Sequence, residues 1–453
     1  MKHIIAIFGM AGLMFAATSC RKYLDVEPKG KVILSTVNDF DLFLNSSSLT
    51  ASGARELNLL SDEADVPAIP LVPTRPEDLV YLWAEQYNTD TKDVPVIWGK
   101  HYGNIYKYNA VLLGINAARN GTDADKKRIR SEALLGRAFE YLYLVNLYAK
   151  PYNSTTADKD LAVPFMVSVD VSEKTPTRST VEEIYNHIFA DINEAIPGLS
   201  ASNAANRFRG SVPAAYSILA RASLYCGRYD DAAKYAKMAM GDNPPALIDY
   251  NTVTKSSQLP KMVDRPTELY ARYSTYPSSW EYPTLNFLKR FDTSDLRLRL
   301  FYTSLGDLSF QKRGVSYFAV NGTPVPNFGT SVEEMKLIIA EVAARKGDMD
   351  AALGQLNDIR KNRIRKSAWK PLTSADKNEV LDWVMRERGF ELAFRGFRWI
   401  DMRRLDAEGK MPAVVRYGAN NEVRATLPPK SARYTLQIPM SVLYFNPDMP
   451  RNE

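Results

Sequence analysis

Three acidic residues close together, Asp62, Glu63 and Asp65, are the part of the sequence most suggestive of acid–base chemistry. A glycosidase works with two carboxyl groups that need no fixed spacing in the sequence, so the residues alone leave this chemistry open. The surrounding segment, 61–95, contains many prolines and no sustained helical period, which predicts a long loop. We therefore expect these carboxylates to lie on a solvated loop or on the polar rim of a pocket.

Other residues with reactive side chains are sparse. After His3 the only histidines are His101 and His187, and neither has a cysteine or histidine at ligand spacing, so we predict no metal site. The GxSxG, HExxH, P-loop and GxGxxG patterns are absent from the sequence. We therefore predict no catalytic residue and no cofactor. Charged residues are dense between 386 and 403, where Glu391 and Arg395 have the spacing of a helical ion pair. We interpret this segment as a structural charge network.

Aromatic residues outside the predicted helices are the best candidates for ligand contact. Aromatic residues make up 11% of the chain, with 25 tyrosines and 6 tryptophans. The flat face of such a ring can stack on the apolar face of a sugar, whose hydroxyls then bond to nearby polar groups. Two irregular regions, 61–95 and 255–283, hold the candidates, which are Trp83, Tyr81, Trp280, Tyr273, Tyr276 and Tyr282. We expect Trp98, Trp383 and Trp399 to belong to the core instead.

The elements that must position these rings are predicted to be helix pairs. Residues 213–244 fit the tetratricopeptide pattern, with Gly227 at the turn, and a second unit at the same spacing begins near Ser331 and turns at Gly347. Two further amphipathic helices are expected at 132–149 and 181–196. The pairs Ser179/Glu182 and Ser331/Glu334 have the spacing of capping boxes at helix starts. The pattern predicts a mostly α fold.

Composition limits the class of protein. The chain has 453 residues, of which 45% are hydrophobic and 24% charged, in keeping with a globular protein that has a sizeable core. The net charge of +6 arises from 58 basic and 52 acidic residues without a clustered basic stripe, which argues against nucleic acid as a partner.

The N-terminal residues predict export and a lipid anchor. Residues 4–17 are apolar but would span roughly 21 Å as a helix, less than the roughly 30 Å hydrocarbon layer, as expected for a signal peptide. Small residues then lead to Cys20, which resembles the bacterial lipobox cysteine that is acylated and becomes the first residue of the mature protein. Because Cys226 is the only other cysteine, no internal disulfide is expected.

Several stretches together resemble the SusD/RagB nutrient-binding lipoproteins of Bacteroidetes. The segment RERGFELAFRGFRWIDMRRL, 386–405, is similar to the C-terminal signature of that family. Other similar stretches occur in the family's order, at 23–30, 98–112, 134–148, 177–196, 291–302 and 437–452. The resemblance covers nearly the whole mature chain.

This resemblance implies a fold and a function. The expected fold is a set of tetratricopeptide-like helix pairs supporting an irregular, loop-rich ligand-binding region. The expected organisation is a signal peptide at 1–19 and one domain at 20–453. Its parts would be an N-terminal part (about 20–245), a ligand-binding part (about 246–330) and C-terminal helices (about 331–453).

The implied protein is not an enzyme. It would be anchored to the outer membrane through Cys20, would face the cell exterior, would capture oligosaccharides and would pass them to a SusC-like TonB-dependent barrel. Oligopeptides are the alternative ligand, because the family includes binders of both. A tetratricopeptide scaffold that docks a partner peptide, and a surface glycoside hydrolase, are the other possibilities that the sequence leaves open.

Overall fold

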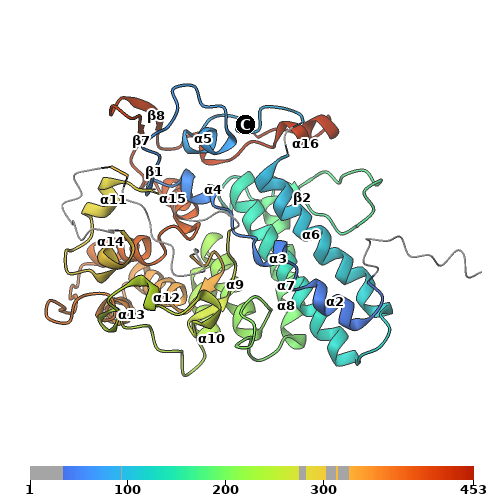
Figure 1. Cartoon of the computed structure of the whole chain (residues 1–453), viewed down its shortest axis with the longest axis horizontal. Coiled ribbons are helices and arrows are strands. Elements are labelled where there is room, and N and C mark those ends of the chain that lie inside the picture. The colour runs from blue at the N-terminus through green and yellow to red at the C-terminus, as the bar shows by residue number, and fades with distance from the viewer. Residues whose placement is uncertain (1–33, 93, 275–281, 303–312, 315–325, 453) are drawn as a thin grey trace, which may run out of the picture.

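The computed structural model describes residues 34–92, 94–274, 282–302, 313–314 and 326–452 (Figure 1). The helices in these ranges are α2 (Val37–Phe43), α3 (Ser47–Thr50), α4 (Glu56–Leu60), α5 (Pro76–Tyr81), α6 (Val96–Gly114), α7 (Asp123–Tyr148), α8 (Val181–Ala195), α9 (Val212–Tyr225), α10 (Tyr229–Met240), α11 (Leu285–Lys289), α12 (Val332–Lys346), α13 (Met349–Lys361), α14 (Lys377–Glu391), α15 (Phe397–Ala407) and α16 (Met440–Phe445). The predicted mostly α, tetratricopeptide-like fold is confirmed.

The strands are short and pair two by two. They are β1 (Ala64–Asp65), β2 (Leu161–Pro164), β3 (Arg178–Thr180), β4 (Glu268–Tyr270), β5 (Tyr282–Pro283), β6 (Thr330–Ser331), β7 (Val414–Tyr417) and β8 (Val423–Leu427). In the described ranges β1 pairs with β5, β2 with β3, β4 with β6 and β7 with β8, all antiparallel. Two of these sheets, β1–β5 and β4–β6, join segments that are distant along the chain, whereas β2–β3 and β7–β8 join neighbouring segments.

The long helices form one continuous row. Helix α6 packs on α7, α7 on α8, α8 on α9, α9 on α10, α10 on α12, and α12 on both α13 and α14. In Figure 1 this row runs from α6, α7 and α8 on the right, through α9 and α10, to α12, α13 and α14 on the left. The irregular segments, with α5, α11, α16 and the strands β1, β7 and β8, lie along the top and left of that row. The helices thus form a scaffold that carries the irregular segments on one side.

Helix α7 lies at the centre of the core. Thr122 and Asp125 form a capping box at its start, and from Ser131 to Tyr148 all but one of its residues are buried. Both predicted turn glycines have the left-handed backbone that favours glycine, with φ of +73° at Gly227 and +86° at Gly347. The predicted helix pairs at 213–244 and from 331 onward therefore form as α9–α10 and α12–α13.

Two predicted capping boxes are wrong in detail. The box of α8 is formed by Thr180 and Glu183, one residue later than expected. At α12 the Ser331 hydroxyl makes no capping bond, and the carboxylate of Glu334 accepts two bonds of 2.8 Å from buried Arg221. A tertiary ion pair thus takes the carboxylate that the local pattern assigns to a cap.

No helix in the described ranges combines the length and apolar character that crossing a membrane requires.

Candidate ligand-binding site

The two irregular regions of the sequence meet in the structure. Strand β1 from the first region pairs with β5 from the second, with Asp65 opposite Tyr282. The Thr284 amide also donates to the Glu63 carbonyl at 2.8 Å. Figure 1 shows β1 and the neighbouring α11 at the upper left, where the irregular segments gather. We call this place the β1–β5 junction.

Arg313 ties a third segment to the junction. Its guanidinium group donates to both carboxylate oxygens of Asp65, at 2.8 and 2.6 Å, and to the Gly418 carbonyl at 2.6 Å. A Cβ built on Gly314 would lie 3.8 Å from the Tyr282 ring, so this backbone passes beside the ring. Asp65 is therefore held in a bidentate ion pair, and Tyr282 is a half-buried ring at the edge of a fixed polar cluster.

Tyr81 and Trp83 belong to the core, which corrects the expectation that they lie on ligand-facing loops. Their exposed fractions are 1% and 2%. The Tyr81 hydroxyl donates to Asp65 at 3.2 Å, and the Trp83 indole donates to the Leu60 carbonyl at 2.9 Å. The guanidinium group of Arg416 covers both rings. Neither ring has a free face on which a sugar could stack.

Two of the remaining candidate aromatics, Tyr273 and Tyr282, lie in the described residues. Tyr273 lies against Phe208, with ring centres 5.8 Å apart, and exchanges backbone bonds with Thr50 and Gly53. It is half-buried, nine residues before Tyr282 in the sequence. The two other candidates, Tyr276 and Trp280, lie outside the described residues, as does Cys20. Of the six predicted rings, Tyr273 and Tyr282 thus keep a partly exposed position in the structure.

The acidic pair Asp62 and Glu63 is divided between two environments. Asp62 accepts two bonds from Arg398, at 2.7 and 2.6 Å. Glu63 is only 1% exposed, and its carboxylate oxygens accept no hydrogen bond from the described residues. Burial raises the pKa of Glu63 to about 8 despite the attraction of Arg398. A general acid needs such a raised pKa, but it must also reach a substrate, and Glu63 is enclosed.

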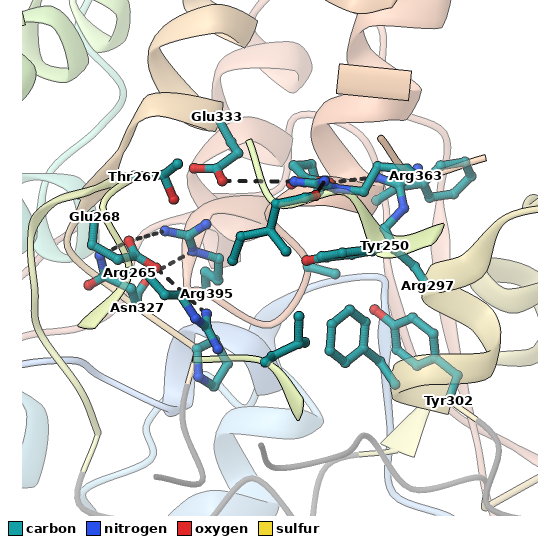
Figure 2. A pocket seen from close by; sticks show the side chains of 17 residues that line it. Tyr250, Arg265, Thr267, Glu268, Arg297, Tyr302, Asn327, Glu333, Arg363 and Arg395 are labelled. Carbon is teal, nitrogen blue, oxygen red and sulfur yellow. Dashed lines mark hydrogen bonds and ion pairs between the residues drawn. The ribbon is translucent and has the colours of Figure 1, made fainter. Parts of the chain in front are cut away.

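The C-terminal charged segment forms a network around a small pocket, shown in Figure 2. Glu391 bonds to Arg363 at 2.6 Å and to Arg297 at 2.8 Å, whereas Arg395 bonds to the Asn327 carbonyl at 2.7 Å and pairs with Glu268 at 3.4 Å. The prediction of a structural network is confirmed, but the expected Glu391–Arg395 pair is replaced by partners from other elements.

The charged pocket is too small for an oligosaccharide. Its volume is about 80 Å³, room for roughly three water molecules, whereas ligand pockets usually exceed about 300 Å³. Burial would raise the pKa of Glu391, but Arg363 and Arg297 lower it to about 2, so this carboxylate stays ionised. Glu333, on the pocket wall in Figure 2, has a raised pKa because of burial and the nearby Glu268 and Glu391 carboxylates. The pocket is best explained as the interior of an ion-pair network.

Among the described residues no three His, Cys, Asp or Glu side chains are grouped as metal ligands would be. His101 is fully buried, and its Nδ1 lies 2.6 Å from a carboxylate oxygen of Glu140, which is equally buried. This histidine has the structural position that the sequence predicts.

The fold and this irregular face define a tetratricopeptide-like scaffold that presents loops and short strands on one side. Two family models match the chain. One, described as "Starch-binding associating with outer membrane", matches residues 22–224, and the other, described as "SusD family", matches residues 334–453. The chain belongs to the SusD/RagB family.

Solved structures of Bacteroides proteins share the fold. A SusD superfamily protein of Bacteroides thetaiotaomicron is 22% identical, with a TM-score of 0.73, and the alignment covers 92% of this chain and all of the other. A putative sugar binding protein of Bacteroides vulgatus is 21% identical, with a TM-score of 0.72 and coverage of 93% and 99%. A SusD-like carbohydrate binding protein of the same species is 19% identical, with a TM-score of 0.68 and coverage of 92% and 97%. No curated protein is significantly similar to the chain in sequence.

Proposed function

We propose that this protein is a cell-surface lipoprotein that captures oligosaccharides and passes them to a SusC-like TonB-dependent outer-membrane barrel. The family description names starch binding and association with the outer membrane, and two proteins of the same fold carry sugar or carbohydrate binding in their names. These descriptions support a glycan as the ligand and the outer membrane as the location of the protein.

The β1–β5 junction is the observation that carries the proposal. It places the half-buried ring of Tyr282 beside the Asp65–Arg313 pair and the backbone of Gly314. A ring next to fixed polar groups is the combination that a pyranose needs, because its apolar face stacks while its hydroxyls form hydrogen bonds. Tyr273, which is also half-buried, is the second described candidate ring for ligand contact.

The protein works by binding without turnover. A solute-binding protein needs different affinities in its free and transporter-bound states, and it needs no bond cleavage. The acidic residues that could suggest hydrolysis are committed to other roles, since Asp62 and Asp65 are each held by an arginine and Glu63 is enclosed. These placements support a binding function.

Titration calorimetry with a panel of oligosaccharides and oligopeptides, followed by chromatography of the ligand, tests the proposal. We expect an oligosaccharide to bind and to be recovered intact. Binding of peptides alone would favour the oligopeptide alternative. A separate measurement in which the bound ligand protects only the helices of 213–365 would favour a peptide-docking scaffold. Shortened products after incubation would show a hydrolase and contradict the proposal.

The transporter partnership has its own test. Purification of the native protein in mild detergents should recover a much larger outer-membrane protein in stoichiometric amount. Recovery of the protein alone, at native expression levels and in several detergents, would contradict the partnership.

A further inference from the structure

A groove of about 410 Å³ runs along one face of α6, apart from the β1–β5 junction. Its floor is a helical stripe spaced by three and four residues, made of Val96, Gly99, Lys100, Gly103, Asn104 and Lys107. The opposite wall comes from Ser48, Ala51, Glu56 and Ser274. Ser274 directly follows Tyr273, so the groove opens beside one of the two partly exposed candidate rings.

Two glycines keep the floor of the groove low. A Cβ built on Gly103 would meet no heavy atom within 4 Å, and one built on Gly99 would meet only Pro95, at 3.7 Å. Glycine in the middle of a helix lowers the stability of that helix. No close packing contact at these two positions explains why α6 has glycine there. An open floor lets a ligand approach the helix backbone closely.

The polar groups of the groove carry unused hydrogen-bonding capacity. The Lys100 ammonium donates to the Gly53 carbonyl at 2.6 Å, and the Lys107 ammonium donates to the Ser48 hydroxyl. Each ammonium has three donors, and within the described ranges neither forms an ion pair. Ser274 is 5% exposed, and its hydroxyl oxygen is buried without a hydrogen-bond partner there.

The two ammonium groups are partly buried, and the carboxylates Glu56 and Glu140 attract Lys100 but not Lys107. Burial lowers the pKa of Lys100 and that of Lys107, because each is partly removed from water. Glu56 is the single carboxylate of the wall, so the lining has two positive groups and one negative group. A ligand that brings one carboxylate and several hydroxyls would match this set of groups.

We propose that the groove along α6 binds a hexuronate unit of an acidic oligosaccharide, with its carboxylate between Lys100 and Lys107 and its hydroxyls toward Asn104, Glu56 and Ser274. The groove has room for a sugar ring, and its two ammonium groups and its hydroxyl and amide groups suit a carboxylate and hydroxyls. This inference rests on the proposed function and specifies the ligand class.

The first experiment compares acidic and neutral sugars that are otherwise alike. Titration calorimetry would use trigalacturonate and triglucuronate, each with its carboxyl-reduced neutral counterpart. We expect one acidic trimer to bind at least about tenfold more tightly than its reduced form, and Lys100→Gln or Lys107→Gln to remove about that advantage. Equal binding of the acidic and reduced forms, or binding of neither acidic trimer, would overturn the inference.

The second experiment fills the groove and uses a matched control. Gly103→Leu replaces a helical glycine with a better helix former, so the melting temperature should hold or rise while binding of the acidic trimer falls by about tenfold or more. Gly354 of α13 also has open space around its Cβ position and lies outside the groove, so Gly354→Leu should leave binding unchanged. Full binding by Gly103→Leu would overturn the inference.

The outcomes separate this inference from the function on which it rests. Neutral oligosaccharides that bind wild type and Lys100→Gln equally, but not Tyr282→Ala, would overturn the groove as a site and leave glycan capture standing. Binding of oligopeptides alone would overturn both.

Discussion

The guanidinium carbon of Arg416 lies 4.2 Å from the centre of the Trp83 indole ring, and it lies 4.3 Å from the centre of the Tyr81 ring. The same guanidinium group donates to the carbonyls of Leu59, Ser61, Ala64 and Tyr81. One arginine of β7 thus fixes the chain on both sides of β1, and through β1 it supports the β1–β5 junction.

Trp83→Ala should lower the free energy of unfolding by about 3–5 kcal/mol, because it removes a large buried ring and leaves a cavity beneath Arg416. Urea denaturation measures this change. Tyr444→Ala is the control, since Tyr444 is 65% exposed and its loss should change stability by less than about 0.5 kcal/mol. If Trp83→Ala kept its stability but lost ligand binding, Trp83 would be a ligand contact and not a core residue.

Tyr282→Ala should weaken oligosaccharide binding by more than about tenfold, because a stacking surface is lost while the backbone pairing of β5 remains. Calorimetry gives the affinity, and a thermal melt should show little change. Tyr282→Phe keeps the ring and should bind nearly as well as wild type. Wild-type affinity in Tyr282→Ala would remove Tyr282 from the site.

Glu63→Gln should make the protein progressively more stable than wild type as the pH rises. The folded pKa of Glu63 is raised from 4.5 to about 8, so the folded state holds a proton that the unfolded state releases between these values. Wild-type stability should therefore fall relative to Glu63→Gln as the pH rises from about 5 through 8, with no difference in slope below 4.5. Chemical denaturation at several pH values checks this, and parallel profiles would show that Glu63 is ionised in the fold.

Glu391→Gln should destabilise the fold by about 3–5 kcal/mol, because it leaves the buried guanidinium groups of Arg363 and Arg297 without a full counter-charge. Glu194→Gln is the matched control, since it breaks the exposed pair with Arg130 and should cost less than about 1 kcal/mol. Equal effects of the two substitutions in urea denaturation would mean that the network contributes little to stability.

Cys20→Ala should abolish the lipid anchor. Radiolabelled palmitate should enter the wild-type protein and not the variant, and the variant should leave the membrane fraction. Because a single acyl chain holds a protein only marginally, the several chains of a bacterial lipoprotein matter for retention. Label in the variant would show that another residue is acylated.

What the sequence by itself determines are the features that depend on neighbouring residues. The periodicity of 213–244 and the turn glycines Gly227 and Gly347 predict α9–α10 and α12–α13, because a helix and its turn are set by residues a few positions apart. The aromatic, proline-rich segments at 61–95 and 255–283 are likewise predicted as irregular, although the first contains the short helix α5 at Pro76–Tyr81, and the family motifs predict the arrangement as a whole.

Only the tertiary structure decides which polar and aromatic side chains are covered. Arg416 reaches Tyr81 across 335 residues of sequence, and Arg221 takes the Glu334 carboxylate across 113 residues, away from a helix cap. Glu391 likewise bonds to Arg363 and Arg297 and not to the arginine one helical turn away. No local pattern contains such contacts, because burial and ion pairing depend on which distant surfaces the fold brings together, and in a water-poor interior the nearest well-oriented partner prevails.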